Sequence, residues 1–246
     1  ARVCKAIYDH PERARQLTIK KNTVAVVTDG TAVLGMGDIG PSAAMPVMEG
    51  KAVLFKQFGN VDAWPVALDT KDPEEIIAIV KAIAPAYGGI NLEDIAAPKC
   101  FDIEARLREE LDIPVFHDDQ HGTAIVTLAA LINALKIVGK RIEEVRIVLS
   151  GVGAAGSAIA KLLMAHGATD IVGYGRTGAL DGAHTEGMNE HRRWLAENTN
   201  PRHVTGNLKE GLVGADVLIG VSSGNLLKPE DLKVMNDGAI VFAMAN

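Results

Sequence analysis

Short apolar runs alternate with longer helical patterns along the first half of the chain. The apolar or β-branched runs that predict strands are residues 23–28, 64–69, 87–94 and 113–116. The helical patterns that predict helices are residues 42–48, 72–84 and 98–111. The helix after Asp72 is the best marked, because an N-cap acid, a proline and a glutamate follow one another at its start. This alternation favours an α/β fold with a mainly parallel sheet.

The second half of the chain begins with an apolar stretch, residues 123–138, which predicts a buried helix too short to cross a membrane. Predicted strands follow at residues 145–150, 171–175, 215–221 and 239–246. We therefore expect two domains, residues 1–122 and residues 123–246. The second should be a doubly wound parallel sheet that is incomplete at its C-terminal end.

The composition argues against several classes of protein. The chain has 246 residues with a net charge of −6, which argues against a nucleic-acid or membrane partner. Cys4 and Cys100 form no CxxC pair, so neither a disulfide framework nor a zinc ribbon is indicated. The sequence shows no signal peptide. These features predict a soluble protein of the cytoplasm.

Two acidic pairs stand where predicted strands end. Glu93 and Asp94 follow one apolar run, and Asp118 and Asp119 follow another. The carboxyl ends of strands are where open α/β sheets bind ligands, and carboxylates are the natural ligands of Mg²⁺ or Mn²⁺. Either pair alone is as easily a solvated or helix-capping group. Both pairs together, upstream of a nucleotide-binding pattern, favour a metal site.

Two lysines and a glycine-rich loop are further candidates. Lys51 and Lys56 flank an apolar segment, and a lysine beside apolar surface can serve as a general base. Position alone favours a solvated role for each, and the sequence does not show which is buried. The loop 35–40 contains three glycines, which either present backbone N–H groups to a substrate carboxylate or permit tight packing.

The pattern GxGxxG lies between a predicted strand and a predicted helix, the context that dinucleotide binding requires. The residues involved are Gly151, Gly153, Ala154, Ala155 and Gly156. Such glycines make the turn, admit the pyrophosphate and allow the helix to pack closely. We expect this segment to bind NADP or NAD.

The end of the next predicted strand bears on which cofactor is bound. An NAD site usually has Asp or Glu there, whereas this chain has glycine followed by Arg176, which favours NADP slightly. Alternatively Arg176 is a surface residue of a loop. Ser222, after a later strand, either lies against the nicotinamide side of the cofactor or is an ordinary turn residue.

Several motifs together resemble the bacterial type of malic enzyme. They are residues 28–30 (TDG), 35–40 (GMGDIG), 45–51 (MPVMEGK), 93–94 (ED), 116–124 (FHDDQHGTA) and 242–246 (FAMAN), in the order of that family. The resemblance implies an N-terminal malic-enzyme domain followed by a Rossmann-type domain. It also implies oxidative decarboxylation of L-malate to pyruvate and CO₂, with NAD or NADP and Mg²⁺ or Mn²⁺.

Roles for single residues follow from the same resemblance. Glu93, Asp94 and Asp119 match the metal ligands, Lys51 matches the general base, and Asp118 matches an acid beside the metal. Asn246 matches a substrate-contacting asparagine. The full-length protein is expected to be a homodimer or higher homo-oligomer.

The resemblance also implies that the chain is a fragment. The family's tyrosine acid would lie before residue 1, so the fragment itself is expected to be impaired or inactive. Two other classes of function stay open. One is another dehydrogenase of similar architecture, of the amino-acid or folate type, which would need no metal. The other is a non-catalytic nucleotide-binding module.

Overall fold

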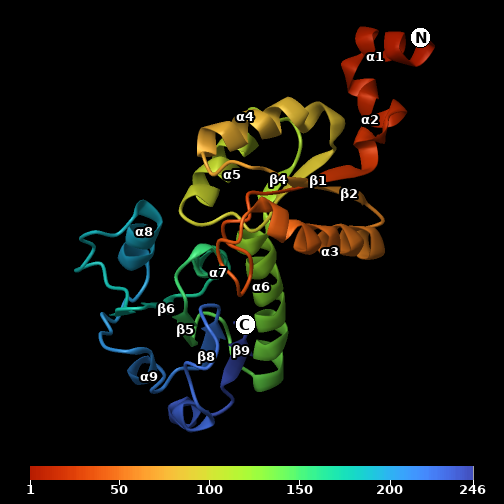
Figure 1. Cartoon of the computed structure of the whole chain (residues 1–246). Helices are drawn as coiled ribbons and strands as arrows, with labels where there is room; N and C mark the ends of the chain where they lie inside the picture. Colours follow the sequence, from red (N-terminus) through yellow and green to blue (C-terminus); the bar gives the residue numbers. More distant parts are fainter. Residues whose placement is uncertain (246) are drawn as a thin grey trace. The chain divides into compact units, whose positions relative to one another are not determined.

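The computed structural model describes residues 1–245 and shows an α/β protein (Figure 1). The chain divides into two compact units, Ala1–Asp118 and Asp119–Asn246. Each unit contains its own parallel sheet. The predicted class, with a mainly parallel sheet in each half, is confirmed.

The first unit is built on four parallel strands in the order β2-β1-β3-β4. The strands are β1 (Thr23–Thr28), β2 (Asp62–Ala67), β3 (Gly89–Leu92) and β4 (Val115–His117). The α-helices are α1 (Arg2–Asp9), α2 (Ala14–Leu17), α3 (Pro41–Gly59), α4 (Pro73–Ile83) and α5 (Lys99–Glu110). The short 3-10 helices are η1 (Pro11–Arg13), η2 (Ile19–Asn22) and η3 (Ala84–Ala86).

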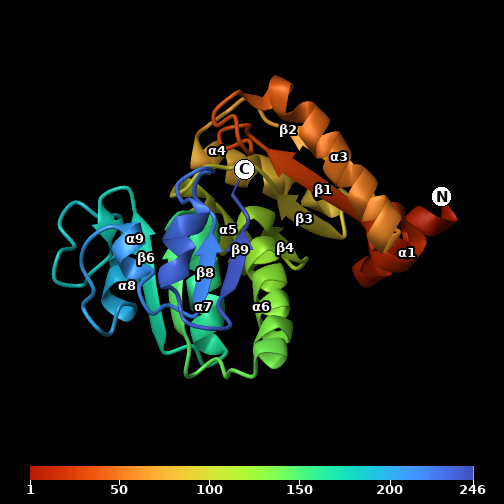
Figure 2. The ribbon, with the colours of Figure 1, turned by 90° about the horizontal axis from the view of Figure 1, so that it is seen from below.

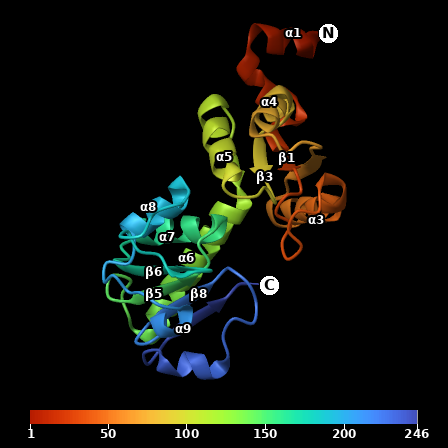
Figure 3. The ribbon, with the colours of Figure 1, turned by 60° about the vertical axis from the view of Figure 1, so that its left-hand side comes forward.

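Helices cover both faces of this sheet. Helix α3 runs along one face, beside β1 and β2, and α4 and α5 lie on the other (Figures 2 and 3). The central strand β1 is accordingly apolar on both sides, and Ala25, Val26 and Val27 are fully buried. Parallel strands put all their carboxyl ends at the same edge, where the acidic pairs were expected.

The sequence patterns predicted the start of α4 correctly but not the length of α3. The start of α4 is confirmed, because the Asp72 carboxylate accepts a hydrogen bond from the Glu74 N–H and Pro73 begins the helix. The pattern around 42–48 underestimated α3, which continues to Gly59. Lys51 and Lys56 therefore lie on one continuous helix rather than at either end of a separate apolar segment.

The second unit contains a sheet in the order β7-β6-β5-β8-β9, in which only β7 is antiparallel. The strands are β5 (Arg146–Ser150), β6 (Asp170–Gly175), β7 (Gly178–Ala179), β8 (Val217–Gly220) and β9 (Ile240–Ala243). The helices are α6 (Asp118–Val138), α7 (Ala154–Ala165), α8 (Glu190–Asn198), α9 (Leu208–Gly211) and the 3-10 helix η4 (Pro229–Val234). Strands β8 and β9 lie side by side, as Figure 2 shows.

The two faces of this sheet build two separate cores. Ile147 and Leu149 of β5 point toward a core shared with α6, α7 and α8, whereas Val148 between them packs with residues near α9 and η4. This alternation is the period of two that a strand imposes on its side chains. Figure 3 shows α7 and α9 on opposite sides of the strands, which is the doubly wound arrangement.

Helix α6 differs from its prediction in both length and burial. It begins at Asp118 and has 21 residues, so it is long and apolar enough to cross a membrane by length and composition alone. That is weak support for a span, because a core helix of a soluble protein passes the same test. The expectation of a buried helix is wrong for one face: Leu131 is buried, but Ile125 and Val126 are more than half exposed.

A buried carboxylate joins three segments of the second unit. Asp216 accepts hydrogen bonds from the Arg146 N–H at 2.9 Å, from Lys140 Nζ at 2.8 Å and from Asn236 Nδ2 at 3.0 Å. Burial acts to raise the pKa of Asp216, but these three donors together lower it. A lowered pKa means that this stabilisation is complete above the unfolded value of about 3.9 and is lost as the pH falls through the folded value.

We therefore predict that Asp216→Ala lowers the free energy of unfolding by about 2 kcal/mol at neutral pH, since it leaves buried donors unsatisfied. The difference from the unmodified chain should shrink as the solution is acidified. Urea unfolding at several pH values, followed by circular dichroism, measures this effect. Asp237→Ala, on an exposed residue nearby, is the control. An equal loss in both variants would contradict the prediction.

Candidate active site

Three carboxylates converge where β3 and β4 end. The strands are paired so that Leu92 lies opposite His117, which brings the next residues of each strand together. Glu93 and Asp94 follow β3, and Asp119 lies in the first turn of α6, which continues directly from β4. Ligand atoms of these three side chains all lie within 4.8 Å of one another. This is the set that the sequence analysis assigned to a metal, and oxygen ligands suit Mg²⁺ or Mn²⁺.

Lys51 lies beside this cluster, on α3. Its Nζ is 2.7 Å from Asp118 Oδ2 and 3.2 Å from Glu93 Oε1. Lys56, in contrast, is an exposed residue paired with Asp62. The structure thus answers which of the two lysines is withdrawn from solvent, and it brings Lys51, Asp118 and Glu93 into contact.

Opposing effects act on the pKa of Lys51. Partial burial acts to lower its pKa, but the hydrogen bond that Lys51 donates to Asp118 and the negative charges of Glu93 and Asp118 raise the pKa overall. The lysine is therefore protonated while both carboxylates are charged. A cation that shares Glu93 would weaken this pairing and favour the neutral amine.

A second polar network, which the sequence analysis missed, joins the segments that follow β1 and β3. The Asp29 side chain is fully buried and accepts hydrogen bonds at Oδ1 from the N–H and the hydroxyl of Thr31, at 3.1 Å and 2.6 Å. The Thr31 hydroxyl oxygen accepts in turn from the Ala96 N–H at 3.0 Å. The Ala32 N–H donates to the Asp94 carbonyl oxygen at 2.9 Å. These contacts hold the backbone of Asp94, which has a left-handed φ of 54°.

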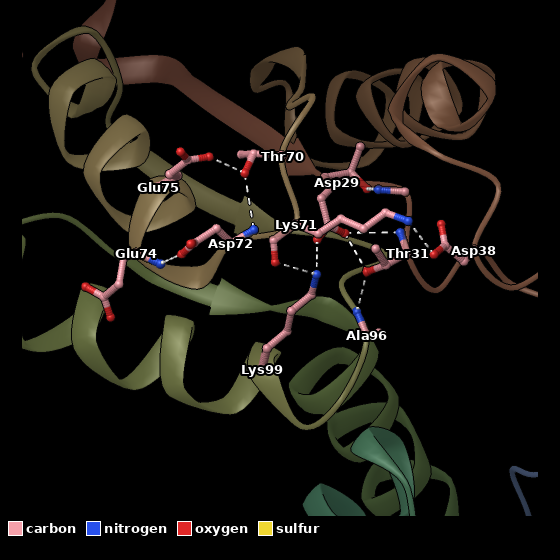
Figure 4. A network of polar contacts seen from close by, with 12 residues as sticks. Asp29, Thr31, Asp38, Thr70, Lys71, Asp72, Glu74, Glu75, Ala96 and Lys99 are labelled. Atoms are coloured by element: carbon pink, nitrogen blue, oxygen red, sulfur yellow. Dashed lines mark hydrogen bonds and ion pairs between the residues drawn. The ribbon is translucent and has the colours of Figure 1, made fainter.

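Lys99 completes this network from the first residue of α5. Its Nζ is 2.5 Å from Asp29 Oδ2 and 3.2 Å from the Lys71 carbonyl oxygen, and Lys71 is itself paired with Asp38 (Figure 4). Segments after β1, β2 and β3 are thus tied at one edge of the sheet. A lysine at a helix start is disfavoured by the helix dipole, and this exception is the signal that marks Lys99 in the sequence.

We predict that Thr31→Val weakens Mn²⁺ binding by about tenfold, since ligand-supporting contacts contribute about that much to metal affinity. The isosteric valine removes the hydroxyl that bridges Asp29 and Ala96. Thr31→Ser, which keeps the hydroxyl, should restore the affinity. Calorimetric titration with Mn²⁺ measures the effect. Equal affinity of the valine and serine variants would show that the hydroxyl has no part in holding the Asp94 segment.

The glycine-rich loop 35–40 is hydrogen-bonded to Gly30. The Gly30 carbonyl oxygen accepts hydrogen bonds from the N–H groups of Ile39 and Gly40. A Cβ on Gly30 would lie only 2.3 Å from the Gly40 backbone, and Gly30 has a φ of +67°. Two N–H donors of the loop therefore already have an internal partner. A Cβ on Gly37 or Gly40 would meet nothing within 4 Å, so their positive φ values of +75° and +79°, and not tight packing, account for glycine at these two positions.

The nucleotide fingerprint has the geometry that its sequence predicts. Gly151 has a φ of +116°, and a Cβ on Gly156 would lie 1.9 Å from the Gly151 carbonyl oxygen, so both positions need glycine. A Cβ on Gly153 would meet nothing within 4 Å, which leaves the approach to the helix start open. Ala154 and Ala155 form the first turn of α7. This cradle fits a pyrophosphate.

Ser222 and Arg176, the other residues predicted to contact the nucleotide, differ in their distance from the fingerprint in the sequence and in their surroundings. The Ser222 hydroxyl lies 3.0 Å from that of Ser150, beside the fingerprint. Arg176 is an exposed turn residue next to Gly175, the last residue of β6. Arg192 of α8, which the sequence analysis did not single out, lies against Gly175. Asn246, the predicted substrate residue, lies outside the described residues.

The chain is similar to known proteins along nearly its whole length. Residues 1–108 match the family model of the malic enzyme N-terminal domain, and residues 120–246 match that of the malic enzyme NAD binding domain. A NAD-dependent malic enzyme of Geobacillus stearothermophilus is 63% identical, over 100% of this chain and 51% of the relative. A bifunctional malic/malolactic enzyme of Bacillus subtilis is 54% identical, over 100% of this chain and 60% of the relative.

Solved structures show the same likeness. The crystal structure of a NAD-dependent malic enzyme from Thermotoga maritima superposes with a TM-score of 0.95 at 52% identity. The superposition covers 99% of this chain and 65% of that one. The chain thus spans about half to two thirds of the length of these three relatives.

Proposed function

This chain belongs to the malic enzyme family. We propose that the full-length protein, with a divalent cation bound, converts L-malate and NAD(P)⁺ into pyruvate, CO₂ and NAD(P)H. The observation that carries the proposal is the contact of Lys51 with a cluster of three carboxylates. The family membership of both units supports it, and the glycine cradle of the second unit supports a nicotinamide dinucleotide as the oxidant.

Glu93, Asp94 and Asp119 would hold the cation. Their oxygen atoms are close enough to share one ion, and this donor set suits Mg²⁺ or Mn²⁺ rather than a softer metal. A bound divalent ion supplies positive charge that polarises the substrate's C2 oxygen. The Asp29–Thr31 contacts would keep the Asp94 segment in place for this task.

Lys51 would act as the base in the first step. Its neutral amine would accept the proton of the C2 hydroxyl while the C2 hydrogen leaves as hydride for the nicotinamide, which gives oxaloacetate. Asp118, at 2.7 Å, would orient the Lys51 amine and stabilise the ammonium that forms. Because this pairing raises the pKa of Lys51, proton uptake is favourable once the amine has become neutral.

The second step breaks the bond between C3 and the adjacent carboxylate. The electron pair of that bond moves toward the C2 carbonyl, CO₂ leaves, and the enolate of pyruvate remains. A proton then adds to C3. The family resemblance assigns this last transfer to a tyrosine whose motif does not match Tyr8 or Tyr87, so we assign it to no residue of this chain.

The first test is cofactor reduction by the full-length protein with L-malate and Mn²⁺, together with measurement of pyruvate. Stoichiometric formation of reduced cofactor and pyruvate that depends on both malate and metal is the expected result. Reduction without any metal requirement would favour an amino-acid or folate type of dehydrogenase instead. Cofactor binding that neither malate nor metal influences would favour a non-catalytic nucleotide-binding module.

We also propose that the full-length protein is a homo-oligomer. Ile125 and Val126 leave an apolar face of α6 exposed, and exposed apolar surface is typical of protein–protein contacts. Light scattering after gel filtration measures the mass. A monomeric full-length protein would contradict this proposal.

A further inference from the structure

Strand β3 has a polar side chain in the middle of its buried run. All four residues of the strand are buried, and Asn91 is 0% exposed between Ile90 and Leu92. Asparagine is depleted in strands, and an amide buried without hydrogen bonds destabilises a fold. An apolar residue would therefore suit this position better if packing alone decided it.

The Asn91 side chain is directed to one of the candidate metal ligands. Side chains two residues apart on an extended chain lie on the same face, which places Asn91 on the side of Glu93. Asn91 Nδ2 donates a hydrogen bond to Glu93 Oε2 at 2.8 Å. Because an ionised carboxylate only accepts hydrogen bonds, the group that faces it is the amide nitrogen and not the amide oxygen.

The two oxygens of the Glu93 carboxylate have different neighbours. Oε2 accepts from the neutral amide of Asn91, whereas Oε1 lies 3.2 Å from Lys51 Nζ. Lys51 reaches the carboxylate with a long side chain from α3 and also contacts Asp118. The amide of Asn91, in contrast, has a short side chain that is fully buried in the sheet. Of the two contacts, the one with Asn91 is therefore the better fixed, and it can hold the carboxylate in one orientation.

The same amide has a buried atom that stability does not explain. Asn91 Oδ1 has no hydrogen-bond partner among the residues that the structure describes. A buried carbonyl oxygen without a partner lowers the free energy of unfolding. A polar residue that the fold itself does not favour is typical of a functional site. The hydrogen bond to Glu93 is the contribution that accounts for asparagine here.

A hydrogen bond to Oε2 limits how Glu93 can bind a cation. Ca²⁺ accepts a carboxylate through both oxygens and tolerates irregular geometry, whereas Mg²⁺ requires nearly ideal octahedral geometry and short distances. Coordination through both oxygens of Glu93 would compete with the hydrogen bond from Asn91. The contact therefore favours a cation that takes a single oxygen of Glu93.

We propose that Asn91 is a positioning residue that fixes Glu93 to bind a cation through one oxygen, and that it thereby favours Mg²⁺ over Ca²⁺. The inference rests on the proposed function, because that function places a divalent cation at Glu93. It adds a residue outside the three ligands that determines which cation the ligands accept. Asn91 acts through Glu93 and has no part in the proton or hydride transfers.

The test measures the cation preference of the full-length protein without malate or nucleotide. Electron paramagnetic resonance of free Mn²⁺ reports binding, and Mg²⁺ and Ca²⁺ then compete for the site. Asn91→Leu keeps nearly the shape of asparagine but has no donor. It should lower the ratio of Mg²⁺ affinity to Ca²⁺ affinity by about tenfold, the usual effect of a contact that orients a metal ligand. A merely structural role would weaken the binding of both cations alike and leave the ratio unchanged.

Ile90→Val is the matched control on the same strand. It removes a buried methylene group, so it should lower the urea concentration at which the protein unfolds. Its side chain lies on the face of the sheet opposite to Asn91, and the ratio of affinities should stay the same. Asn91→Ala is smaller than asparagine and cannot overpack the strand. This variant should lower the ratio as Asn91→Leu does, and it replaces the leucine variant if that one does not fold.

Two outcomes separate the role of Asn91 from the proposed function. An unchanged ratio in a folded Asn91 variant that still binds Mn²⁺ would overturn the inference, and malate turnover by the unmodified protein would leave the proposed function intact. Failure of the unmodified protein to bind any of the three cations would overturn both.

Discussion

Replacing Lys51 with methionine is expected to lower the turnover of malate by about a thousand-fold, the usual contribution of a positioned base. Methionine keeps the apolar stem of lysine but cannot accept the proton of the C2 hydroxyl. The structure makes this residue the base candidate because its amine contacts Asp118 and Glu93, and because most of its side chain is withdrawn from solvent. Steady-state formation of reduced cofactor by the full-length protein measures the effect.

A measurement of Mn²⁺ binding distinguishes the loss of the base in the Lys51 variant from general damage to the site. Removing a positive charge 3.2 Å from Glu93 should make Mn²⁺ binding at least as tight as in the unmodified protein. Lys56→Met, on the exposed end of the same helix, is the matched control and should retain full turnover. Turnover by the Lys51 variant close to that of the control would exclude Lys51 as the base.

The second large effect is expected from Asp119→Asn. This change removes one of three negative charges that lie within 4.8 Å of one another, and it should weaken Mn²⁺ binding by at least about a hundredfold. Electron paramagnetic resonance of free Mn²⁺ measures binding without reference to activity. Turnover should fall in parallel and recover only partly at high Mn²⁺ concentration.

Asp118→Asn is the matched comparison for Asp119→Asn. Asp118 is adjacent in sequence but its carboxylate is directed to Lys51, at 2.7 Å. Asp118→Asn should therefore change Mn²⁺ affinity far less than Asp119→Asn, although both changes remove one negative charge from the first turn of α6. If the two variants bind Mn²⁺ equally, the metal is not held by Asp119 in particular and the assignment of ligands is wrong.

Patterns within single elements predicted much of the fold. The N-cap of α4 and the fingerprint before α7 depend only on residues within a few positions of one another, and both are confirmed. Helix α6 shows the limit of this approach. Its apolar residues surround the whole helix, and no periodicity indicates which side packs against the sheet and which remains exposed, as Ile125 does.

The sequence likewise predicted only part of the candidate site. Its acidic pairs were visible because each follows an apolar run in the sequence, and parallel strands place their carboxyl ends at one edge. The choice between Lys51 and Lys56 was not visible. Both lie on the continuous helix α3, and the contacts of Lys51 with Glu93 and Asp118, which only the tertiary structure forms, distinguish it from the exposed Lys56.

Local spacing and composition were enough to predict the class of fold, the family resemblance and the residue types available for metal, base and nucleotide. The ion pair of Lys99 with Asp29, 70 residues apart in the chain, and the position of Arg192 beside Gly175 could be found only in the three-dimensional structure. Such contacts depend on how strands are ordered in a sheet and how helices pack on it. Those are long-range choices that no local pattern encodes.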